Sequence, residues 1–426
     1  MTALVDAAYA AGLVAASPLL AWKLLHGPKR RSDWPARLGR GGALPAPRIG
    51  GRVLIHAVSV GEVNAARQLV ETLTRNHDVV LSATTDTGFA RAQQLFGQRI
   101  AVVRYPLDAG FAVERFLNRI RPTLVALMEL EAWPNFIDAC VRRGIHVGVV
   151  NGRLSERSFT RYRFARPVLR SMFGSLAFVC AQTDAYADRF VAMGTPRDRV
   201  QVTGTMKWDT AQVADQVEGS DALAAAMGID MSRPLVVAGS TAPDEEAMLH
   251  AIVPSGTQLL CAPRRPEWFD IAAAAMPGCV RRSRGGGSPA SDRFLLDTIG
   301  ELRKAYALAT VVVVGRSFGE LHGSDMMEPV ALGKATLIGP RYGDFADTAE
   351  KLVAAGGLRV SSRHEIARDL AALLADAPAR EDMARAGRTV IAREQGATAR
   401  HAALLSHLLL QGVAPDAKLP AGATHA

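Results

Sequence analysis

A glutamate stands directly after a glycine in HAVSVGEVNAARQLVETL, residues 56–73. The run VLIHAV just before it is typical of a buried parallel strand, and from Val63 onward apolar residues recur at helical spacing. Glu62 is therefore predicted to lie in the first turn of a helix at the carboxyl end of a strand, where open α/β sheets bind ligands. A helix N-terminus favours the ionised carboxylate, so Glu62 could accept a proton. The alternative interpretation is a glutamate that only complements the helix dipole.

Charged residues follow several other predicted strands. The motifs MELEAWPNF, GTMKWD, CAPRRPEWF and DTIGEL each come at or just after the end of an apolar run. Their charged members include Glu129, Glu131, Lys207, Arg264 and Arg265. Guanidinium groups bind phosphate or carboxylate through paired hydrogen bonds, so the two arginines are candidates for holding an anion. Taken singly, carboxylates and lysines are usually solvated surface groups, which is the alternative here.

A glycine-rich polar loop lies in GRSFGELHGSDMMEPVALGKATLIGP, residues 315–340. It follows a predicted strand and enters a helix near Met326 or Met327. Asp325 is available as a cap, and Glu328 falls in the first turn. Free amides at a helix start suit an anion, and a carboxylate suits the hydroxyls of a ribose. The alternative is simply a capped helix that follows a strand.

The elements that position these residues alternate between short apolar runs and helical patterns from about residue 50 onward. Strands alternating with helices of this length indicate an α/β fold with parallel sheets. The alternation restarts after a polar segment, so the chain is predicted to form two Rossmann-like domains facing a cleft. The predicted parts are a membrane anchor or interfacial helix (1–25), an N-terminal domain (26–207), a linker (208–233), a C-terminal domain (234–415) and a tail (416–426).

The N-terminus departs from the pattern of a plain soluble protein. Residues 3–22, ALVDAAYAAGLVAASPLLAW, are nearly all apolar, and the strongly basic segment 23–40 follows them. A secretory signal would carry its positive charge before the apolar run. A short tilted anchor and an interfacial helix both fit, and a soluble helix is the alternative. The positive-inside rule places the basic segment and everything after it on the cytoplasmic side.

Composition narrows the classes of partner. The 426 residues include 50 Lys and Arg against 41 Asp and Glu, and the net charge of +9 favours an anionic partner such as a nucleotide, a lipid phosphate or a membrane surface. No recognition-helix motif occurs, so we expect no nucleic acid as a partner. The 4 cysteines stand far apart, and no DxD, HExxH or Cys/His cluster occurs. We therefore expect reduced thiols, no metal ion and no cofactor.

Arginine is concentrated in NGRLSERSFTRYRFARPVLR, residues 151–170. Pro167 is predicted to open a second helix within this segment. One interpretation is a basic patch that faces lipid phosphates, and the other is a solvated face.

Six of these motifs, in order, resemble a known family. HAVSVGE, MELEAWPN, NGRLSERS, GTMKWD, APRRPE and MEPVALGK…IGP resemble the Kdo (3-deoxy-D-manno-octulosonic acid) transferases of lipopolysaccharide synthesis. The likeness runs from the N-terminal apolar segment almost to the C-terminus. It implies a GT-B fold, CMP-Kdo as donor, a lipid A precursor (lipid IVA) as acceptor, and metal-independent transfer with inversion at the anomeric carbon. It also implies a place at the inner (cytoplasmic) membrane, with the catalytic domains on the cytoplasmic side.

The resemblance implies roles for individual residues. Glu62 matches the family's general base, which would take the proton of the acceptor hydroxyl as that oxygen attacks the anomeric carbon. Glu131 and Lys207 match positions that stabilise the transition state. Three segments match those that hold the CMP donor: Pro263 and Arg264; Ile299, Gly300 and Glu301; and Asp325, Met326, Met327 and Glu328.

One departure from the family pattern falls in the last of these segments. The family commonly reads glycine-glycine-histidine-asparagine-proline-leucine-glutamate where this chain has HGSDMME, so Asp325 replaces an amide. An added negative charge beside an anionic sugar nucleotide should weaken binding unless Asp325 only caps the helix.

Two alternative functions stay open beside the Kdo transferase. One is another GT-B enzyme, either a transferase with a different sugar nucleotide or a nucleotide-sugar epimerase, and the apolar N-terminus argues against a soluble epimerase. The other is a catalytically inactive binding protein. The presence of Glu62, Lys207, Arg264 and Glu328 argues against inactivity.

Overall fold

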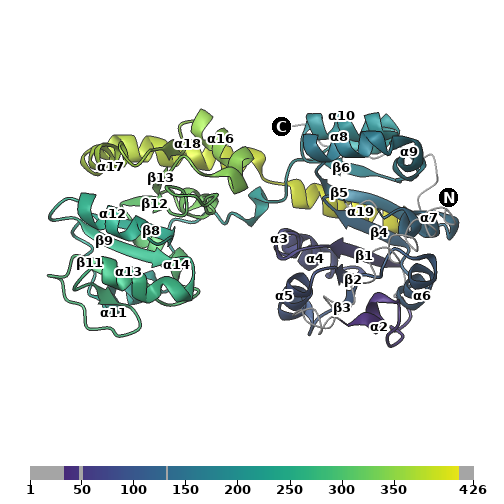
Figure 1. The fold of residues 1–426 in the computed structure, drawn as a ribbon, viewed down its shortest axis with the longest axis horizontal. Helices are drawn as coiled ribbons and strands as arrows, with labels where there is room; N and C mark the ends of the chain where they lie inside the picture. The colour runs from purple at the N-terminus through teal and green to yellow at the C-terminus, as the bar shows by residue number, and fades with distance from the viewer. Residues whose placement is uncertain (1–32, 48–50, 131–132, 412–426) are drawn as a thin grey trace, which may run out of the picture. The chain divides into compact units, whose positions relative to one another are not determined.

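The computed structural model describes residues 33–47, 51–130 and 133–411. Contacts between Cα atoms divide the chain into two compact units, one that ends at Thr210 and resumes at Gln395, and one that spans Ala211–Glu394. Each unit has a seven-stranded parallel sheet between layers of helices (Figure 1). The two parallel-sheet α/β domains predicted from the sequence are confirmed.

In the first unit the strand order is β3-β2-β1-β4-β5-β6-β7. The chain enters at β1, runs outward to β3 and then crosses to β4, which pairs with the other edge of β1 (Val53↔Leu124). The strand order therefore reverses between β1 and β4, and this switch point is where such sheets bind ligands. The strands are β1 Arg52–Ala57, β2 Asp78–Ala83, β3 Ala101–Arg104, β4 Leu124–Met128, β5 His146–Gly152, β6 Val179–Ala181 and β7 Val200–Val202. The helices are α2 Trp34–Arg37, α3 Val60–Ala65, α4 Arg67–Leu73, α5 Asp86–Phe96, α6 Gly110–Ile120, α7 Pro134–Arg142, α8 Glu156–Phe164, α9 Arg166–Gly174, α10 Asp184–Met193 and α19 Ala397–Gln411, with 3₁₀ turns η2 Arg197–Arg199 and η3 Trp208–Thr210.

In the second unit the strand order is β10-β11-β9-β8-β12-β13-β14. The chain enters at β8, and β12 pairs with the edge of β8 that β9 leaves open (Val311↔Val236), so the switch point lies between β8 and β12. The strands are β8 Leu235–Thr241, β9 Gln258–Pro263, β10 Val280–Arg281, β11 Arg293–Leu295, β12 Val311–Val314, β13 Ala335–Ile338 and β14 Arg359–Val360. The helices are α11 Ser220–Met227, α12 Glu245–Ile252, α13 Phe269–Ala275, α14 Leu302–Leu308, α15 Met327–Ala331, α16 Ala346–Ala354, α17 Ile366–Ala375 and α18 Ala377–Glu394, with 3₁₀ turns η4 Pro266–Trp268 and η5 Gly343–Phe345.

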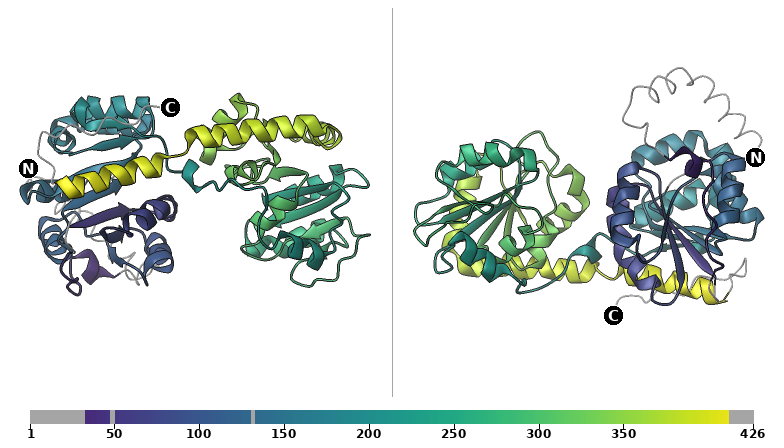
Figure 2. Two further views of the ribbon diagram at one scale, coloured as in Figure 1. Left: turned by 180° about the vertical axis from the view of Figure 1, so that it is seen from behind. Right: turned by 90° about the horizontal axis from the view of Figure 1, so that it is seen from below.

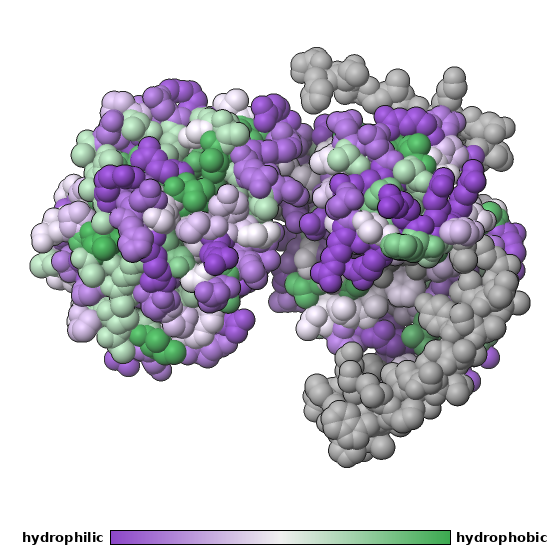
Figure 3. All heavy atoms as spheres, turned by 45° about the horizontal axis from the view of Figure 1, so that its top comes forward, coloured by the Kyte–Doolittle hydropathy of each residue, from purple (hydrophilic) through white to green (hydrophobic). Residues whose placement is uncertain are grey.

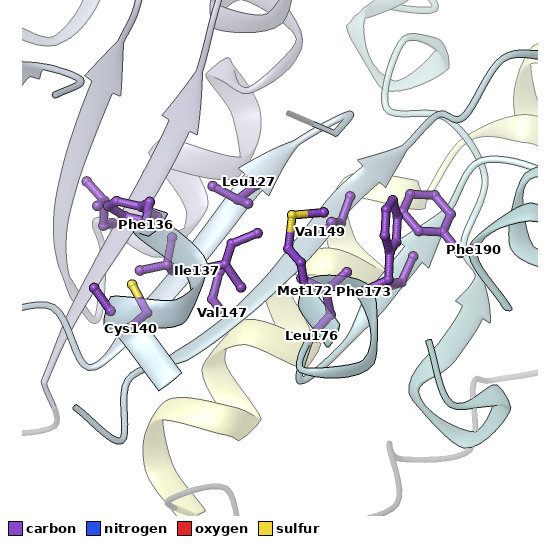
Figure 4. Packing of buried hydrophobic residues seen from close by; sticks show 14 of the residues in the cluster. Leu127, Phe136, Ile137, Cys140, Val147, Val149, Met172, Phe173, Leu176 and Phe190 are labelled. Atoms are coloured by element: carbon purple, nitrogen blue, oxygen red, sulfur yellow. The ribbon is translucent and has the colours of Figure 1, made fainter. Parts of the chain in front are cut away.

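Alternate residues of each strand in the first sheet supply two separate cores. Leu54 and Leu127 belong to one buried cluster, whereas their neighbours Ile55 and Ala126 belong to another. This follows from strand geometry, because successive side chains point to opposite faces. Figure 4 shows the first cluster, in which Leu127 and its neighbours on the sheet lie against side chains of α7, α9 and α10. Both faces are therefore covered, as the continuous apolar runs of the strands predict.

The C-terminal helix α19 belongs to the first unit, although it follows the second unit in the chain. Its buried leucines, Leu404, Leu405 and Leu408, join the second core cluster of the first sheet. The helix is drawn in yellow in Figures 1 and 2, against the first sheet. The sequence prediction placed 234–415 in one C-terminal domain. The structure differs because the apolar face of α19 is buried on β4 and α4 instead.

The segment predicted as the linker, 208–233, is divided between the units. The 3₁₀ turn η3 closes the first unit, and α11 packs on α14 in the second. None of the helices in the described ranges is both long and apolar enough to cross a membrane. The predicted anchor, 1–25, and the tail, 416–426, lie outside the described residues. On the face drawn in Figure 3, hydrophobic residues occur as small patches among hydrophilic ones.

Candidate active site

Glu62 lies in the first turn of α3, directly after β1 and beside the switch point of the first sheet. Ser59 is the N-cap residue, and its hydroxyl accepts the Glu62 N–H (3.4 Å). In return, the Glu62 carboxylate accepts the Val58 N–H at Oε2 (2.9 Å) and the Ser59 hydroxyl at Oε1 (3.2 Å). The predicted strand-to-helix placement is confirmed. The half-buried carboxylate is oriented by these two donors.

The start of α5 holds the turn that precedes Glu62. Thr85 donates its N–H (3.0 Å) and its hydroxyl (2.9 Å) to the Val58 carbonyl. Gly88 approaches the same turn so closely that a Cβ there would meet Val58 O at 3.0 Å. Sequence reasoning missed both residues, because their partner lies on a different strand-to-helix turn.

The end of β4, across the switch point from β1, has an unusual backbone. Glu129 has a φ of 60°, in the left-handed region that non-glycine residues rarely adopt. Its N–H donates to Val150 O (3.0 Å), and its carbonyl accepts the Arg153 N–H (3.0 Å), so β5 holds this conformation in place. Glu131, predicted to stabilise the transition state, lies outside the described residues.

A buried carboxylate, Asp108, anchors the next helix. It accepts the N–H groups of Asn135 (3.1 Å) and Phe136 (2.8 Å) at the start of α7. Asp108 thereby fixes the WPN end of the MELEAWPN motif. The sequence did not reveal this role, because the carboxylate stands 27 residues before the amide that it caps.

Lys207 is half-buried and follows β7. The N–H of its neighbour Met206 donates to Asn151 Oδ1 (3.0 Å), which brings this turn back over the end of β5. Two residues later, the Asp209 carboxylate accepts two N–H groups at the start of α19 (2.6 and 2.5 Å). Hydrogen bonds therefore join the motifs NGRLSERS and GTMKWD into one structure that supports Lys207. The start of α19 is bonded to the same structure.

Two buried histidines in the first unit are neutral. Burial lowers the pKa of His56 to about 3, and its ring stacks on Tyr105 with centroids 3.8 Å apart. Burial likewise lowers the pKa of His401 to about 4, and its Nε2 accepts the Asn151 N–H (2.9 Å). Sequence reasoning singled out neither. Because both rings are buried, we assign these histidines a structural role beside the motifs that contain His56 and Asn151.

In the second unit, the segments predicted to hold the donor follow strands β9, β11 and β12. Strands β11, β9, β8 and β12 are consecutive in the sheet, so all three segments meet at its carboxyl edge. Pro263 ends β9 and is buried, whereas Arg264 is exposed. The Arg264 N–H donates to Thr241 O (3.0 Å), which ties this turn to the end of β8.

The second predicted donor segment is held by an arginine that sequence reasoning left unassigned. Ile299 is exposed, and Gly300 has a φ of 94°, which suits glycine. The Glu301 carboxylate pairs with Nε and Nη2 of Arg282 (3.1 Å each) and accepts the Thr298 hydroxyl (2.6 Å). Burial opposes ionisation of Glu301, but these hydrogen bonds outweigh it and lower the pKa. The carboxylate therefore stays charged and shapes the turn.

The third segment begins with a capped turn. Asp325 is exposed, and its Oδ1 accepts the N–H of Met327, the first residue of α15 (2.8 Å). Met326 and Met327 are buried beneath the turn. The Glu328 carboxylate is half-buried, and burial raises its pKa although Arg303 lies 3.6 Å away. The helix start agrees with the sequence prediction, whereas the N-cap residue is Met326, and Asp325 lies one position before it.

One residue that sequence reasoning did not weigh, Glu245, joins the loops on both sides of the second switch point. Its carboxylate accepts four backbone N–H groups: those of Ala242 (2.9 Å), Arg316 (2.8 Å), Ser317 (3.0 Å) and Phe318 (3.1 Å). The side chain is 1% exposed. A signal was present, since Glu245 opens a helix after a strand just as Glu62 does. Through its four hydrogen bonds, Glu245 fixes the loops after β8 and β12 to one another.

No group of three or more His, Cys, Asp or Glu within the described ranges is placed to hold a metal ion. A groove lined by Gly333, Arg385 and Arg388 opens beside α18, near the residues that precede β13. It lies at the amino end of that strand, away from the predicted donor segments.

Comparison with known proteins places the chain in a family. A sequence profile described as "3-Deoxy-D-manno-octulosonic-acid transferase (kdotransferase)" matches residues 32–210. The 3-deoxy-D-manno-octulosonic acid transferase of Bordetella pertussis is 35% identical over 420 residues, covering 92% of this chain and 96% of that protein. The transferase of Haemophilus influenzae with the same name is 30% identical, covering 91% and 93%.

Solved structures support the fold at lower identity. A glycosyltransferase from Rickettsia africae has a TM-score of 0.57 at 10% identity, covering 85% of this chain and 99% of that chain. A UDP-GlcNAc 2-epimerase from Neisseria meningitidis has a TM-score of 0.54 at 14% identity, covering 85% and 100%. These likenesses show two parallel-sheet domains like those of GT-B proteins, whereas the curated relatives carry the family. The chain therefore belongs to the 3-deoxy-D-manno-octulosonic acid transferase family and is a glycosyltransferase.

Proposed function

We propose that the enzyme transfers Kdo from CMP-Kdo to a lipid A precursor (lipid IVA) in lipopolysaccharide synthesis, with Glu62 as the general base. The observation that carries this proposal is the position of Glu62 beside the switch point of the first sheet, with both carboxylate oxygens oriented by hydrogen-bond donors. A base held in one orientation removes a proton more effectively than a freely rotating one.

The proposed reaction is one inverting displacement that needs no metal ion. An acceptor hydroxyl oxygen bonds to the anomeric carbon of Kdo as the bond to the phosphate oxygen breaks. The hydroxyl proton passes to Glu62, and CMP leaves with the electron pair. Without a metal, the developing charge needs protein cations, and Lys207 forms no ion pair with any other described residue. Lys207 and Glu131 are proposed to stabilise the transition state, as the family resemblance implies.

The acceptor and the site of action are proposed to be those of the cytoplasmic leaflet of the inner membrane. The apolar run followed by basic residues at the N-terminus supports attachment there. Helix α8 adds a second, described feature. No residue of α8 is buried, Arg161 and Arg163 are exposed, and Phe164 is 85% exposed. Exposed cations on the same helix as an exposed aromatic side chain suit an anionic membrane surface.

A product assay tests the reaction. The purified full chain is incubated with CMP-Kdo and tetraacylated lipid A precursor, with and without EDTA, and the lipid is analysed by mass spectrometry. We expect a mass gain of whole Kdo units in both arms. Parallel incubations with other sugar nucleotides, including UDP-GlcNAc to detect epimerisation, test the alternative enzymes. Transfer or epimerisation with another sugar nucleotide only would overturn the proposal, and loss of activity with EDTA would overturn its metal-free part.

A vesicle assay tests the membrane surface. The chain lacking residues 1–25 should bind anionic vesicles at low salt and release at high salt, because the contact is electrostatic. Arg161→Gln with Arg163→Gln should weaken binding about tenfold or more, at about 1 kcal/mol per cation. The matched control is Arg385→Gln with Arg393→Gln, which removes two exposed charges from α18 in the second unit. Equal loss in both double variants would show that only net charge matters.

A further inference from the structure

We infer that Arg316 binds an anionic group of the sugar-nucleotide donor, either its phosphate or the carboxylate of its sugar. Arg316 follows β12 and lies at the switch point of the second sheet. It lies outside the three segments that the family resemblance assigns to the donor. The inference rests on the proposed function and adds to it a residue that selects an anionic donor.

The backbone of Arg316 is held on both sides. Its N–H donates to Glu245 Oε2 (2.8 Å), and its carbonyl accepts the Gly323 N–H (2.8 Å). Between these bonds, Arg316 has a φ of 57°, which is strained for a residue with a Cβ. Glycine is the residue that adopts such a φ without strain. An arginine here therefore indicates that its side chain contributes something glycine could not.

Such strain is concentrated at the strand ends where ligands bind. Six non-glycine residues within the described ranges have left-handed φ: Arg121, Glu129, Asn151, Ser240, Asp244 and Arg316. All except Arg121 lie at, or within three residues of, the carboxyl end of a strand. Backbone strain persists mainly where function maintains it. Ser240 lies in β8 and Arg316 follows β12, and these two strands border the second switch point.

The guanidinium of Arg316 has no partner within the described residues. Its Nε is buried and makes no hydrogen bond, and the side chain forms no ion pair. Three other arginines of this unit are paired with carboxylates: Arg281 with Asp297, Arg282 with Glu301, and Arg303 with Glu328. A buried donor left without an acceptor is costly, so the site is suited to an anion that arrives from outside the protein.

The position of Arg316 also bears on the negative charge that Asp325 adds to the predicted donor loop. The Gly323 N–H binds the Arg316 carbonyl, and Asp325 follows two residues later in the same loop. Asp325 adds a negative charge to a segment that is expected to hold an anionic donor. Arg316 supplies a positive charge next to this loop, which offsets that repulsion.

Titrations of the full chain with CMP, cytidine and CMP-Kdo test the inference. Arg316→Gln keeps the stem of the side chain and removes the charge. If the anion is the phosphate, CMP should bind about 10- to 100-fold more weakly and cytidine should bind as before. If the anion is the sugar carboxylate, CMP should bind as before and the KM for CMP-Kdo should rise by a similar factor. Unchanged CMP affinity together with an unchanged KM would overturn the inference.

Arg316→Gly separates a ligand contact from a structural role. Because glycine relieves the left-handed strain, the urea midpoint of unfolding should stay equal or rise while donor affinity falls. Arg121→Gly is the matched control, since Arg121 has a φ of 52° at the end of α6 in the first unit. It should leave donor affinity unchanged. A fall in stability of Arg316→Gly that accounts for the weaker binding would make Arg316 structural. A wild-type chain that binds neither CMP nor CMP-Kdo overturns the proposed function itself.

Discussion

The two units place a glutamate at the same point of two similar sheets, but its surroundings differ. Glu62 opens α3 after β1, and Glu245 opens α12 after β8. The carboxylate of Glu62 is half-buried and accepts hydrogen bonds from its own turn, at Val58 and Ser59. The carboxylate of Glu245 is 1% exposed and accepts four backbone N–H groups from two loops.

The difference shows that position in a fold does not decide what a carboxylate does. Glu62 retains exposed surface, through which a substrate hydroxyl can reach it. Glu245 is enclosed, so its carboxylate can serve only the architecture of the switch point. Substitution should therefore damage catalysis in the first unit and folding in the second.

The largest effect is expected for Glu62→Gln. Glutamine preserves the shape of the side chain but accepts no proton, so turnover should fall by about 10²–10⁴ while CMP affinity persists. The measurement is the initial rate of Kdo transfer at saturating substrates. Glu71→Gln on α4 is the control, because Glu71 only pairs with Arg67 at the surface. Near wild-type turnover of Glu62→Gln would reduce Glu62 to a helix-dipole residue.

Glu245→Gln should act on stability instead. The amide nitrogen must replace one carboxylate oxygen, and each oxygen accepts two N–H groups, so two buried donors lose their acceptor. We expect a loss of about 2–4 kcal/mol in the unfolding free energy of the second unit. Hydrogen exchange of peptides from β8 and β12 measures it, with exposed Glu320→Gln as the control. Unchanged protection would show that the four hydrogen bonds are not required.

Lowering the pH from 7 to 5 should weaken the first unit selectively. The pKa values of His56 and His401 are lowered to about 3 and about 4 from 6.5, because burial disfavours their charged forms. Below pH 6.5, the unfolded state therefore binds more protons than the folded state. The unfolding free energy of the first unit then falls as the pH falls, and at pH 5 the loss is about 2 kcal/mol per histidine. In the second unit, burial raises the pKa of Glu246 to about 6, so its folded form gains protons and the sign is opposite.

Hydrogen exchange of each unit at the two pH values measures this difference. His401→Gln should remove its share of the pH dependence of the first unit, although it also loses the hydrogen bond to Asn151. Equal acid weakening of both units would contradict the assignment to the histidines.

Glu328→Gln tests whether the Glu328 carboxylate, in the second unit, binds the donor. Unlike that of Glu245, its side chain keeps 37% of its surface exposed. If it accepts hydrogen bonds from the ribose, CMP should bind about 10- to 100-fold more weakly to the variant. Burial raises the pKa of Glu328. As the pH is lowered, the CMP affinity of the wild type should therefore begin to fall at a higher pH than an ordinary glutamate would give. Wild-type affinity in the variant would refute the ribose contact.

The sequence predicted the features that depend on local pattern. Glu62 after β1, the Ser59 cap of α3 and the start of α15 follow from apolar runs and capping residues a few positions apart. The family followed from six short motifs in order.

Features that join distant parts of the chain were missed. Asp108 caps a helix that begins more than twenty residues later, and Glu245 binds a loop more than seventy residues away. Helix α19 was assigned to the wrong domain, because nothing in its own sequence specifies which sheet it covers. Such contacts depend on the sheet order, which periodicity does not encode.

The smallest effect is expected for Asp325→Asn. Like Glu62, Asp325 is accessible beside a helix start, and like Glu245 its oxygen accepts a backbone N–H, that of Met327 (2.8 Å). Asparagine keeps an oxygen for this bond, so CMP and CMP-Kdo affinities should change by less than about twofold, with little loss of stability. Calorimetric titration of both ligands measures the change. If the charge instead faces the donor, removing it tightens binding. In that case, Arg316→Gln with Asp325→Asn should bind more tightly than Arg316→Gln alone, because the repulsion that Arg316 offsets is gone.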